Sequence, residues 1–316
     1  MLHLITLDDW TADRIGQVLD LADAVKREPA RYERAMHRKV LLMVFEKPSL
    51  RTRVSFETGM CQMGGDAIYY DTTTSPLGAG KETIEDMVRV ASRYVDLIMA
   101  RLYDHLDIEK MAAHATVPVI NALTNFAHPC QILADLQTIR EKKKRLKGLT
   151  LTYFGDSNNN VTHSLMYGGA RMGLHVRVAC PELPEYSPLE SVLRQSRAAA
   201  AESGGSVEVF HDARTAAEGA DVLYTDSWMS YHIDKDQLDE RVKVFTPYQV
   251  NAGLLEAADP EALFMNCLPA MRGYEQTAEV IDGPRSIVFD QAENRLHAQK
   301  AVMLMLREEA TALGGL

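Results

Sequence analysis

The chain has 316 residues, of which 46% are hydrophobic and 25% are charged, so it is long enough for two globular cores. Its formal net charge of −10 argues against a general nucleic-acid binder, because such proteins neutralise phosphates with Lys and Arg. We find no apolar run of about 18 residues and no basic leader, so we expect no membrane partner and no signal peptide.

The four cysteines are widely spaced and form no C-x-x-C pair; they are Cys61, Cys130, Cys180 and Cys267. This spacing matches no metal framework, so we expect no metal site and no cofactor. Sparse cysteine in a large chain is typical of reduced thiols, which predicts a cytoplasmic protein.

Apolar runs rich in β-branched residues alternate with helical patterns along the whole chain. The first half has predicted strands at Val40–Phe45, Ile68–Tyr70, Leu97–Ala100 and Val117–Asn121, and predicted helices at Arg53–Met63, Thr83–Tyr94, Ile108–Ala115 and Cys130–Lys144. The second half has predicted strands at Leu149–Phe154, Val176–Ala179, Val207–Phe210, Val222–Thr225, Leu263–Asn266 and Ile287–Phe289, and predicted helices at Val161–Met172, Ser187–Ser203 and Glu293–Leu313.

This alternation predicts an α/β fold with two doubly wound parallel-sheet domains, because parallel strands need helical crossovers on both faces. We expect the domains to comprise residues 1–146 and 147–292, with the C-terminal helix 293–316 packing back on the first. Ligands of such sheets bind beyond the carboxyl ends of the strands, so we expect the active site in a cleft between the two domains.

The segment Pro48-Ser49-Leu50-Arg51-Thr52-Arg53 directly follows a predicted strand and opens a predicted helix. Free N–H groups and the helix dipole favour an anion at such a turn, and Arg supplies forked donors that match phosphate oxygens. The turn therefore predicts a phosphorylated small-molecule ligand.

Polar side chains also follow other predicted strands. Arg101 follows one strand, and His128 and Gln131 follow the next. In the second half, the polar residues that follow strands include Asn160, Asp226, Ser230 and Cys267. This distribution predicts an anion site on one domain and an acid-bearing polar site on the other.

Six motifs in order resemble those of the aspartate/ornithine carbamoyltransferase family, and more closely its ornithine enzymes. They are Phe45–Arg53, His128-Pro129-Cys130-Gln131, Asp156–Ser164, Asp226-Ser227-Trp228-Met229-Ser230, Cys267-Leu268-Pro269-Ala270 and Phe289–His297. The resemblance covers nearly the whole chain and implies carbamoyl transfer from carbamoyl phosphate to the δ-amine of ornithine.

The resemblance implies a role for each matching residue of the carbamoyl-phosphate site. Ser49, Leu50, Arg51, Thr52 and Arg53 would hold the phosphate. Arg101 and His128 would polarise the carbonyl, Gln131 would bind the carbamoyl amide, and Arg295 would close the site from the C-terminal helix.

The same resemblance assigns the amino-acid site to the second half. Asn160 and Asp226 would hold the α-carboxylate and α-amino group, with Ser230 assisting. Cys267 and the Leu268 carbonyl would lie by the attacking amine and the carbamoyl group. Without the resemblance, each of these residues has an ordinary structural reading as a cap, a turn residue or a small core residue.

Three residues depart from the pattern of the ornithine enzymes. Tyr231 and His232 replace the usual Met-Gly after the D-x-W-x-S motif, and Asn266 replaces a His before Cys-Leu-Pro. A different amine acceptor, such as a modified ornithine or a diamine, and a catalytically silent paralogue therefore stay open. The family also implies a homotrimer, with a residue of a neighbouring subunit completing the site.

Overall fold

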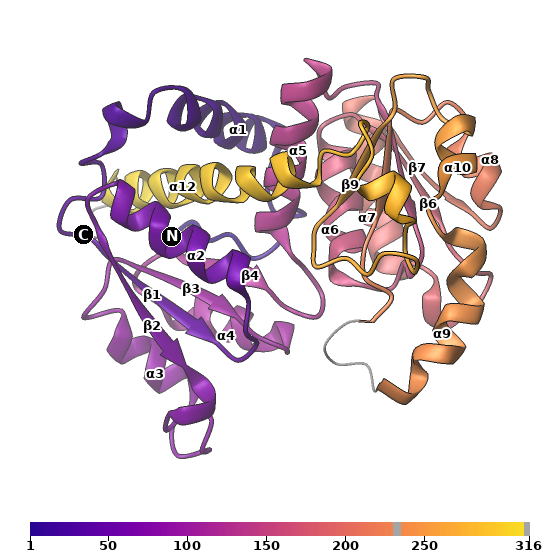
Figure 1. The fold of residues 1–316 in the computed structure, drawn as a ribbon. Coiled ribbons are helices and arrows are strands. Elements are labelled where there is room, and N and C mark those ends of the chain that lie inside the picture. Colours follow the sequence, from indigo (N-terminus) through magenta and orange to yellow (C-terminus); the bar gives the residue numbers. More distant parts are fainter. Residues whose placement is uncertain (230–234, 313–316) are drawn as a thin grey trace. The chain divides into compact units, whose positions relative to one another are not determined.

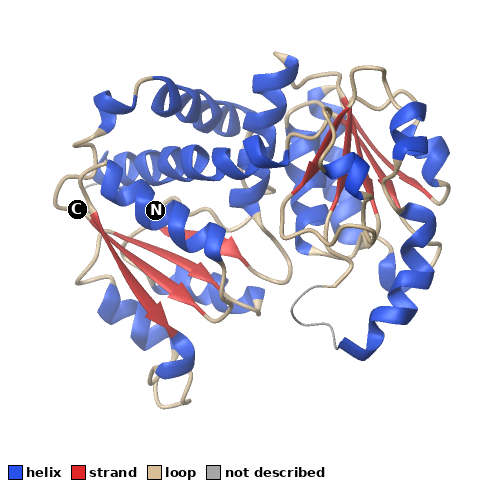
Figure 2. Ribbon diagram, in the orientation of Figure 1, coloured by secondary structure: helices blue, strands red, loops and turns tan. Residues whose placement is uncertain are grey.

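The computed structural model describes residues 1–229 and 235–312, and this part of the chain divides into two compact units. Unit 1 comprises Met1–Gln137 and Glu293–Leu316, and unit 2 comprises Thr138–Ala292. Both units consist of a parallel sheet with helices on its two faces, so the predicted α/β class with two parallel sheets is confirmed (Figures 1 and 2). No helix in the described ranges is both long and apolar enough to cross a membrane.

The sheet of unit 1 has the strand order β2-β1-β3-β4, and all of its pairs are parallel. Its elements are α1 (Ala12–Arg27), β1 (Val40–Phe45), α2 (Leu50–Gln62), β2 (Asp66–Asp71), α3 (Ile84–Ala91), β3 (Leu97–Arg101), α4 (His105–His114), β4 (Val119–Leu123), α5 (Pro129–Lys143) and α12 (Val288–Ala312), with 3₁₀ turns at Pro29–Tyr32 and Thr72–Thr74.

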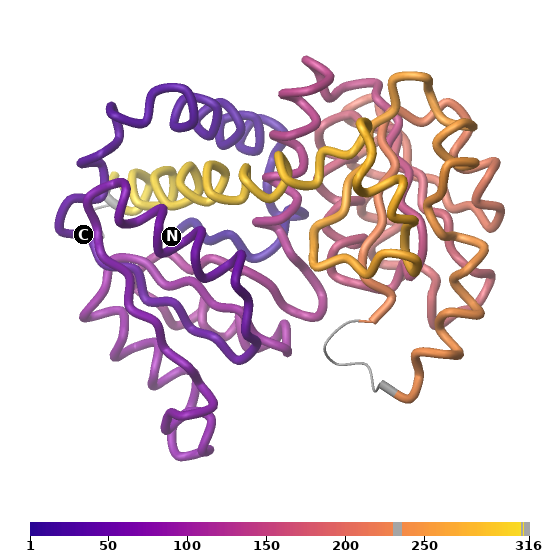
Figure 3. The backbone as a smooth tube through the Cα atoms, in the orientation of Figure 1, coloured from indigo at the N-terminus to yellow at the C-terminus, as the bar shows by residue number. Residues whose placement is uncertain are grey.

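The two faces of this sheet carry different helices (Figure 1). One face packs against α3 and α4 through a buried core that includes Leu42, Val88 and Ile108. On the other side, α12 lies along α1 and α2 (Figure 3). The contact between α2 and α12 is close, because a Cβ on Gly59 would lie 3.3 Å from the Lys300 and Met303 side chains.

The sheet of unit 2 has the strand order β7-β6-β5-β8-β9, again all parallel. Its elements are β5 (Thr150–Phe154), α6 (Asn160–Arg171), β6 (His175–Ala179), α7 (Glu190–Ser203), β7 (Ser206–Phe210), α8 (Ala213–Ala217), β8 (Val222–Thr225), α9 (Leu238–Phe245), α10 (Ala252–Ala257), β9 (Leu263–Asn266) and α11 (Ala278–Ile281), with 3₁₀ turns at Pro184–Tyr186, Lys235–Gln237 and Thr246–Tyr248.

The strand predicted at Ile287–Phe289 is wrong, because α12 already begins at Val288. Ser286 makes only an isolated parallel bridge to Phe264, and Ile287 N donates to the Phe264 carbonyl at 3.0 Å. Phe289 is 70% exposed on the first turn of the helix. A run of three apolar residues cannot distinguish a strand from the buried start of a helix, which explains the error.

Each sheet has one point at which the chain reverses its direction of winding. In unit 1 the chain adds β2 on one side of β1 and then β3 and β4 on the other side. In unit 2 it adds β6 and β7 on one side of β5 and then β8 and β9 on the other side. Ligands bind at such switch points, since the loops that leave adjacent strands there diverge to opposite faces.

Candidate functional site

The switch point of unit 1 lies between the carboxyl ends of β1 and β3. Arg101 is the last residue of β3, and its carbonyl accepts a hydrogen bond from Glu46 N at 3.0 Å. The Arg101 side chain is buried, and its Nε donates to the Lys47 carbonyl at 3.1 Å. The turn after β1 and the guanidinium of Arg101 therefore hold each other in place.

The predicted phosphate turn forms the start of α2. Ser49 is the N-cap, since its Oγ accepts a hydrogen bond from Thr52 N at 3.3 Å, and Leu50 is the first helical residue. Leu50 is 76% exposed, so its part in any ligand contact comes from its backbone N–H rather than from packing of its side chain. An N-terminus of this kind presents unpaired helix donors to an anion.

Arg295 joins three elements of unit 1 that are far apart in sequence. Its Nη1 donates to Gln131 Oε1 at 2.7 Å, and its Nη2 donates to Thr52 Oγ1 at 3.4 Å. Gln131 in turn donates from Nε2 to Asp135 Oδ1 at 2.9 Å. All four side chains are buried, so α2, α5 and α12 meet at a fixed polar site.

His128 lies at the start of α5, surrounded by positive charge. Its pKa is well below 6.5 because the ring is buried and because Arg295, Arg101, Lys47 and Arg51 disfavour a second proton. We call these four cations and His128 the cationic cluster. The imidazole is therefore neutral near pH 7 and can donate one hydrogen bond to an oxygen without itself adding charge.

This neutral His128 predicts a pH dependence of stability. In the unfolded chain His128 accepts a proton below about pH 6.5, whereas the ring in the folded state stays neutral. The free energy of unfolding therefore falls as the pH drops, by up to about 1.4 kcal/mol per pH unit. His128→Gln is expected to show a shallower slope than the wild type in urea unfolding between pH 7 and 5, because it lacks this contribution, whereas His37→Gln at an exposed site retains the full slope. Equal slopes in the two variants would contradict the neutral ring.

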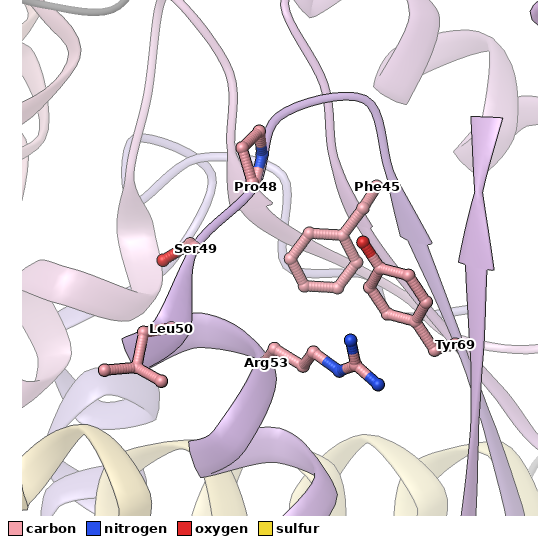
Figure 4. A pocket seen from close by; sticks show the side chains of 6 residues that line it. All are labelled: Phe45, Pro48, Ser49, Leu50, Arg53 and Tyr69. Carbon is pink, nitrogen blue, oxygen red and sulfur yellow. The ribbon is translucent and has the colours of Figure 1, made fainter. Parts of the chain in front are cut away.

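Arg53 occupies a different environment from the cationic cluster. Its guanidinium lies over the Tyr69 ring at 4.0 Å, and its Nε lies 3.4 Å from Glu57 Oε2 (Figure 4). Arg53 and Tyr69 line a surface pocket of about 250 Å³, together with Phe45, Pro48, Ser49 and Leu50. Arg53 thus faces the edge strand β2, while Thr52 faces Arg295.

The switch point of unit 2 lies between β5 and β8. Asn159 is the N-cap of α6, and its Oδ1 accepts from Val161 N and Thr162 N at 2.9 Å each. Asn160 is the first residue of that helix. Gly155 has φ +122°, and a Cβ there would lie 3.3 Å from Trp228 Nε1, so only glycine lets the β5 turn pass under the Trp228 ring.

Asp226 and Cys267 lie together at the ends of β8 and β9. Cys267 Sγ donates to Asp226 Oδ1 at 3.0 Å, although the two residues are 41 positions apart. Leu268 has φ 56°, and its N–H donates to Asn266 Oδ1 at 2.7 Å. A carboxylate, a thiol and a turned backbone segment therefore converge at one edge of the sheet.

The sequence did not identify Arg241, which connects the turn after β5 with the segment after β8. Its Nη2 lies 2.5 Å from Asp156 Oδ2, and its Nε donates to the Trp228 carbonyl at 2.6 Å. The guanidinium also lies 5.0 Å from the Phe245 ring centroid. A charged residue on the apolar stripe of its helix was the available signal, but nothing in the sequence named its partner.

Lys47 was also missed as a member of the cationic cluster. It is only 3% exposed, and its Nζ lies 5.3 Å from the Tyr103 ring centroid. A lysine two residues after a buried strand was the signal, because such a position places the charge beside the switch point. Ser230, Tyr231 and His232 lie outside the described residues.

Known proteins match both units. The carbamoyl-P binding domain model of aspartate/ornithine carbamoyltransferase matches residues 2–141, and the Asp/Orn binding domain model of the same family matches residues 147–306. An ornithine carbamoyltransferase of Parafrankia sp. is 51% identical over 98% of this chain and 97% of its own length. An anabolic one of Pyrococcus furiosus is 51% identical over 96% of this chain and 95% of its own length.

Solved structures agree with these sequences. The ornithine carbamoyltransferase structure from Pyrococcus furiosus has a TM-score of 0.90 at 51% identity, covering 95% of each chain. An acetylornithine transcarbamylase complexed with acetylcitrulline has a TM-score of 0.86 at only 32% identity, covering 97% of this chain and 99% of its own. The chain therefore belongs to the aspartate/ornithine carbamoyltransferase family, and it is a carbamoyltransferase.

Proposed function

We propose that this enzyme transfers the carbamoyl group of carbamoyl phosphate to the δ-amine of L-ornithine, giving L-citrulline and phosphate. The observation that carries the proposal is the cationic cluster, in which four cations surround a neutral, buried His128 beside a free helix N-terminus. Such a site suits a phosphorylated substrate whose carbonyl becomes negative during the reaction. The identity of 51% to ornithine enzymes supports ornithine over acetylornithine as acceptor.

The unit 1 residues have separate roles in this proposal. Ser49, Leu50, Arg51, Thr52 and Arg53 bind the phosphate, largely through backbone N–H groups of α2. Arg101 and neutral His128 donate to the carbonyl oxygen, where charge develops when the amine attacks. Gln131 binds the carbamoyl amide, and Arg295 holds Gln131 and Thr52 in position.

The unit 2 residues take the acceptor. Asn160 binds the α-carboxylate, and Asp226 binds the α-ammonium group, with Ser230 and Tyr231 as further acceptor-binding residues. Cys267 lies beside Asp226 and near the attacking amine, and Leu268 offers its carbonyl as an acceptor for the carbamoyl amide. The δ-amine attacks as a free base, the C–N bond forms, and the C–O bond to phosphate breaks. The proton that the nitrogen loses leaves with the phosphate as HPO4²⁻.

Further assignments belong to the same proposal. Residues 1–146 with 293–316 form the carbamoyl-phosphate-binding domain, and 147–292 form the ornithine-binding domain, which the two matched family models support. We propose a homotrimer or a higher multiple and a cytoplasmic location, where the free thiols of all four cysteines stay reduced. We also propose arginine biosynthesis as the direction of use, in line with the anabolic relative.

An acceptor panel tests the proposed function. The enzyme and carbamoyl phosphate are mixed with ornithine, N-acetylornithine, putrescine, lysine or aspartate, and phosphate release is measured against the uncatalysed breakdown of carbamoyl phosphate. We expect release with ornithine to exceed release with every other amine by at least about 100-fold, because Asp226 and Asn160 pair only with a free α-amino acid of the right length.

Each other outcome of the panel has a clear meaning. Faster release with N-acetylornithine or putrescine would replace ornithine by that acceptor. Binding of carbamoyl phosphate with no release on any amine would instead indicate a silent paralogue. Either result would overturn the proposed function.

A further inference from the structure

The loop that carries Cys267 and Leu268 rests on three buried polar side chains. Asn266, Glu275 and Gln276 are at most 1% exposed. Asn266 Oδ1 accepts from Leu268 N at 2.7 Å, and Asn266 Nδ2 donates to Gln276 Oε1 at 3.0 Å. We call these three residues the loop-supporting triad.

The far end of the loop is held by the other two members of the triad. Glu275 Oε1 accepts from Met271 N at 2.9 Å, and Gln276 Nε2 donates to the Met271 carbonyl at 3.2 Å. Gly273 has φ +87°, which lets the chain turn back from Met271 to Glu275. Both backbone polar groups of Met271 are therefore satisfied by side chains that follow it in sequence.

The second oxygen of Glu275, Oε2, is buried, and no hydrogen-bond partner for it exists among the described residues. The hydrogen bond from Met271 N therefore does not explain why this side chain is a carboxylate. A neutral Gln would hold Met271 N equally well. Burying a carboxylate without a full set of partners is unfavourable, so a negative charge here needs another reason. Burial and the charge of Asp226 raise the pKa of Glu275 to about 7.

The charged surroundings of Glu275 point to Asp226. After burial, the negative charge of Asp226 at the end of β8 also raises the pKa of Glu275, while the hydrogen bond from Met271 N lowers it. Arg272, in the same loop, is held away by two hydrogen bonds to Asp282 at 2.6 and 2.8 Å near solvent. A cation that arrives at Asp226 would therefore act on Glu275 with nothing in the loop to offset it.

We propose that Glu275 is a second acidic determinant of acceptor recognition, which ionises when the α-ammonium group of the acceptor binds beside Asp226. The inference rests on the proposed function, because it takes the acceptor to be a free amino acid. Binding the ammonium group cancels the repulsion between the two carboxyl groups, so Glu275 releases its proton to solvent. By linkage, ionised Glu275 then strengthens binding of the ammonium group.

Calorimetry with L-norvaline measures this proton release. Norvaline has the α-amino and α-carboxylate groups of the acceptor but no δ-amine, so carbamoyl phosphate can be present at saturation without reacting. Titrations in buffers of different ionisation enthalpy, such as PIPES and imidazole, give the number of protons released. Since about half of Glu275 is protonated at pH 7, we expect about half a proton per site from the wild type.

Three variants separate the charge of Glu275 from its hold on the loop. Glu275→Gln retains an acceptor for Met271 N and is expected to bind norvaline with no proton release. It is also expected to lose the roughly tenfold gain in affinity that the wild type shows between pH 6 and 8. Glu279→Gln removes an exposed carboxylate four residues further along and is expected to behave as the wild type. Glu275→Ala additionally removes the hydrogen bond to Met271 N and is expected to lower kcat for ornithine more than Glu275→Gln does.

The outcomes distinguish this inference from the proposed function. Norvaline that binds the wild type and Glu275→Gln with equal proton release would overturn the role of Glu275 and leave the proposed function intact. Norvaline that fails to bind the wild type at all would overturn the amino-acid acceptor and, with it, this inference. A loss of kcat in Glu275→Ala alone, with the affinity of Glu275→Gln for norvaline rising between pH 6 and 8 as in the wild type, would show that the side chain only shapes the loop.

Discussion

Replacing Arg101 by Met is expected to lower kcat for carbamoyl transfer by about 10²–10³-fold, with little change in the KM for ornithine. Loss of one preorganised donor to a developing oxyanion typically has this effect. Arg101 is preorganised because it is buried at the end of β3 and its Nε is fixed on the Lys47 carbonyl at 3.1 Å. Met fills a similar volume, so the variant tests the charge rather than the packing.

The measurement is the initial rate of citrulline formation at saturating concentrations of both substrates. Arg89→Met serves as the matched control, because Arg89 is an exposed residue of α3 whose ion pair with Asp86, at 3.3 Å, is also exposed. We expect the control to retain wild-type kcat. A kcat for Arg101→Met within about threefold of the wild type would remove Arg101 from the catalytic step.

Replacing Arg241 by Met is expected to reduce the free energy of unfolding of unit 2 by about 3–5 kcal/mol. The substitution leaves the Asp156 carboxylate, which is only 14% exposed, without its cation, and removal of one partner of a mostly buried pair costs about this much. It also removes the donor to the Trp228 carbonyl, on the segment that follows Asp226. We therefore expect a higher KM for ornithine in addition to the loss of stability.

The two tryptophans of the chain, Trp10 in unit 1 and Trp228 in unit 2, allow this loss to be assigned. In a Trp10→Phe background, fluorescence during urea unfolding reports on unit 2 alone. Arg272→Met is the matched control, because its pair with Asp282 is about half exposed and such pairs contribute about 0–1 kcal/mol. Similar losses in the two variants would mean that the Arg241–Asp156 pair does not hold this edge together.

Most strands were predictable because buried parallel strands have a strong local signature. Val40–Phe45, Val222–Thr225 and Leu263–Asn266 are observed at the predicted limits, since each is a short apolar run bounded by polar turn residues. Helix α1 was not predicted, although Thr11 caps it, because no functional motif drew attention to it. The wrong strand at Ile287–Phe289 was predicted from a run of only three apolar residues, which is too short to distinguish a strand from the start of a helix.

The candidate site was predictable only in part, because sequence patterns locate the ends of strands but not the order of the strands in a sheet. Residues that directly follow strands, such as Arg101 and Asp226, can be placed at a sheet edge from the pattern alone. Whether two such residues meet depends on strand order, and the contact between Asp226 and Cys267 follows from the adjacency of β8 and β9. Arg241 and Glu275 lie outside the motifs, and although a charge on the apolar stripe of α9 draws attention to Arg241, nothing in the sequence names the partners of either residue.

Local chemistry along the chain accounts for the alternation of strands and helices, the polar turns after the strands and the family to which the chain belongs. These features depend on neighbouring residues, whose periodicity and turn propensity act within a few positions. The arrangement of the site is different. Arg295 reaches Gln131 and Thr52 across 164 and 243 positions, and the pKa of His128 falls because the ring is buried and because four cations from other parts of the sequence surround it. Such effects arise only once the topology has brought strand ends together and removed them from water.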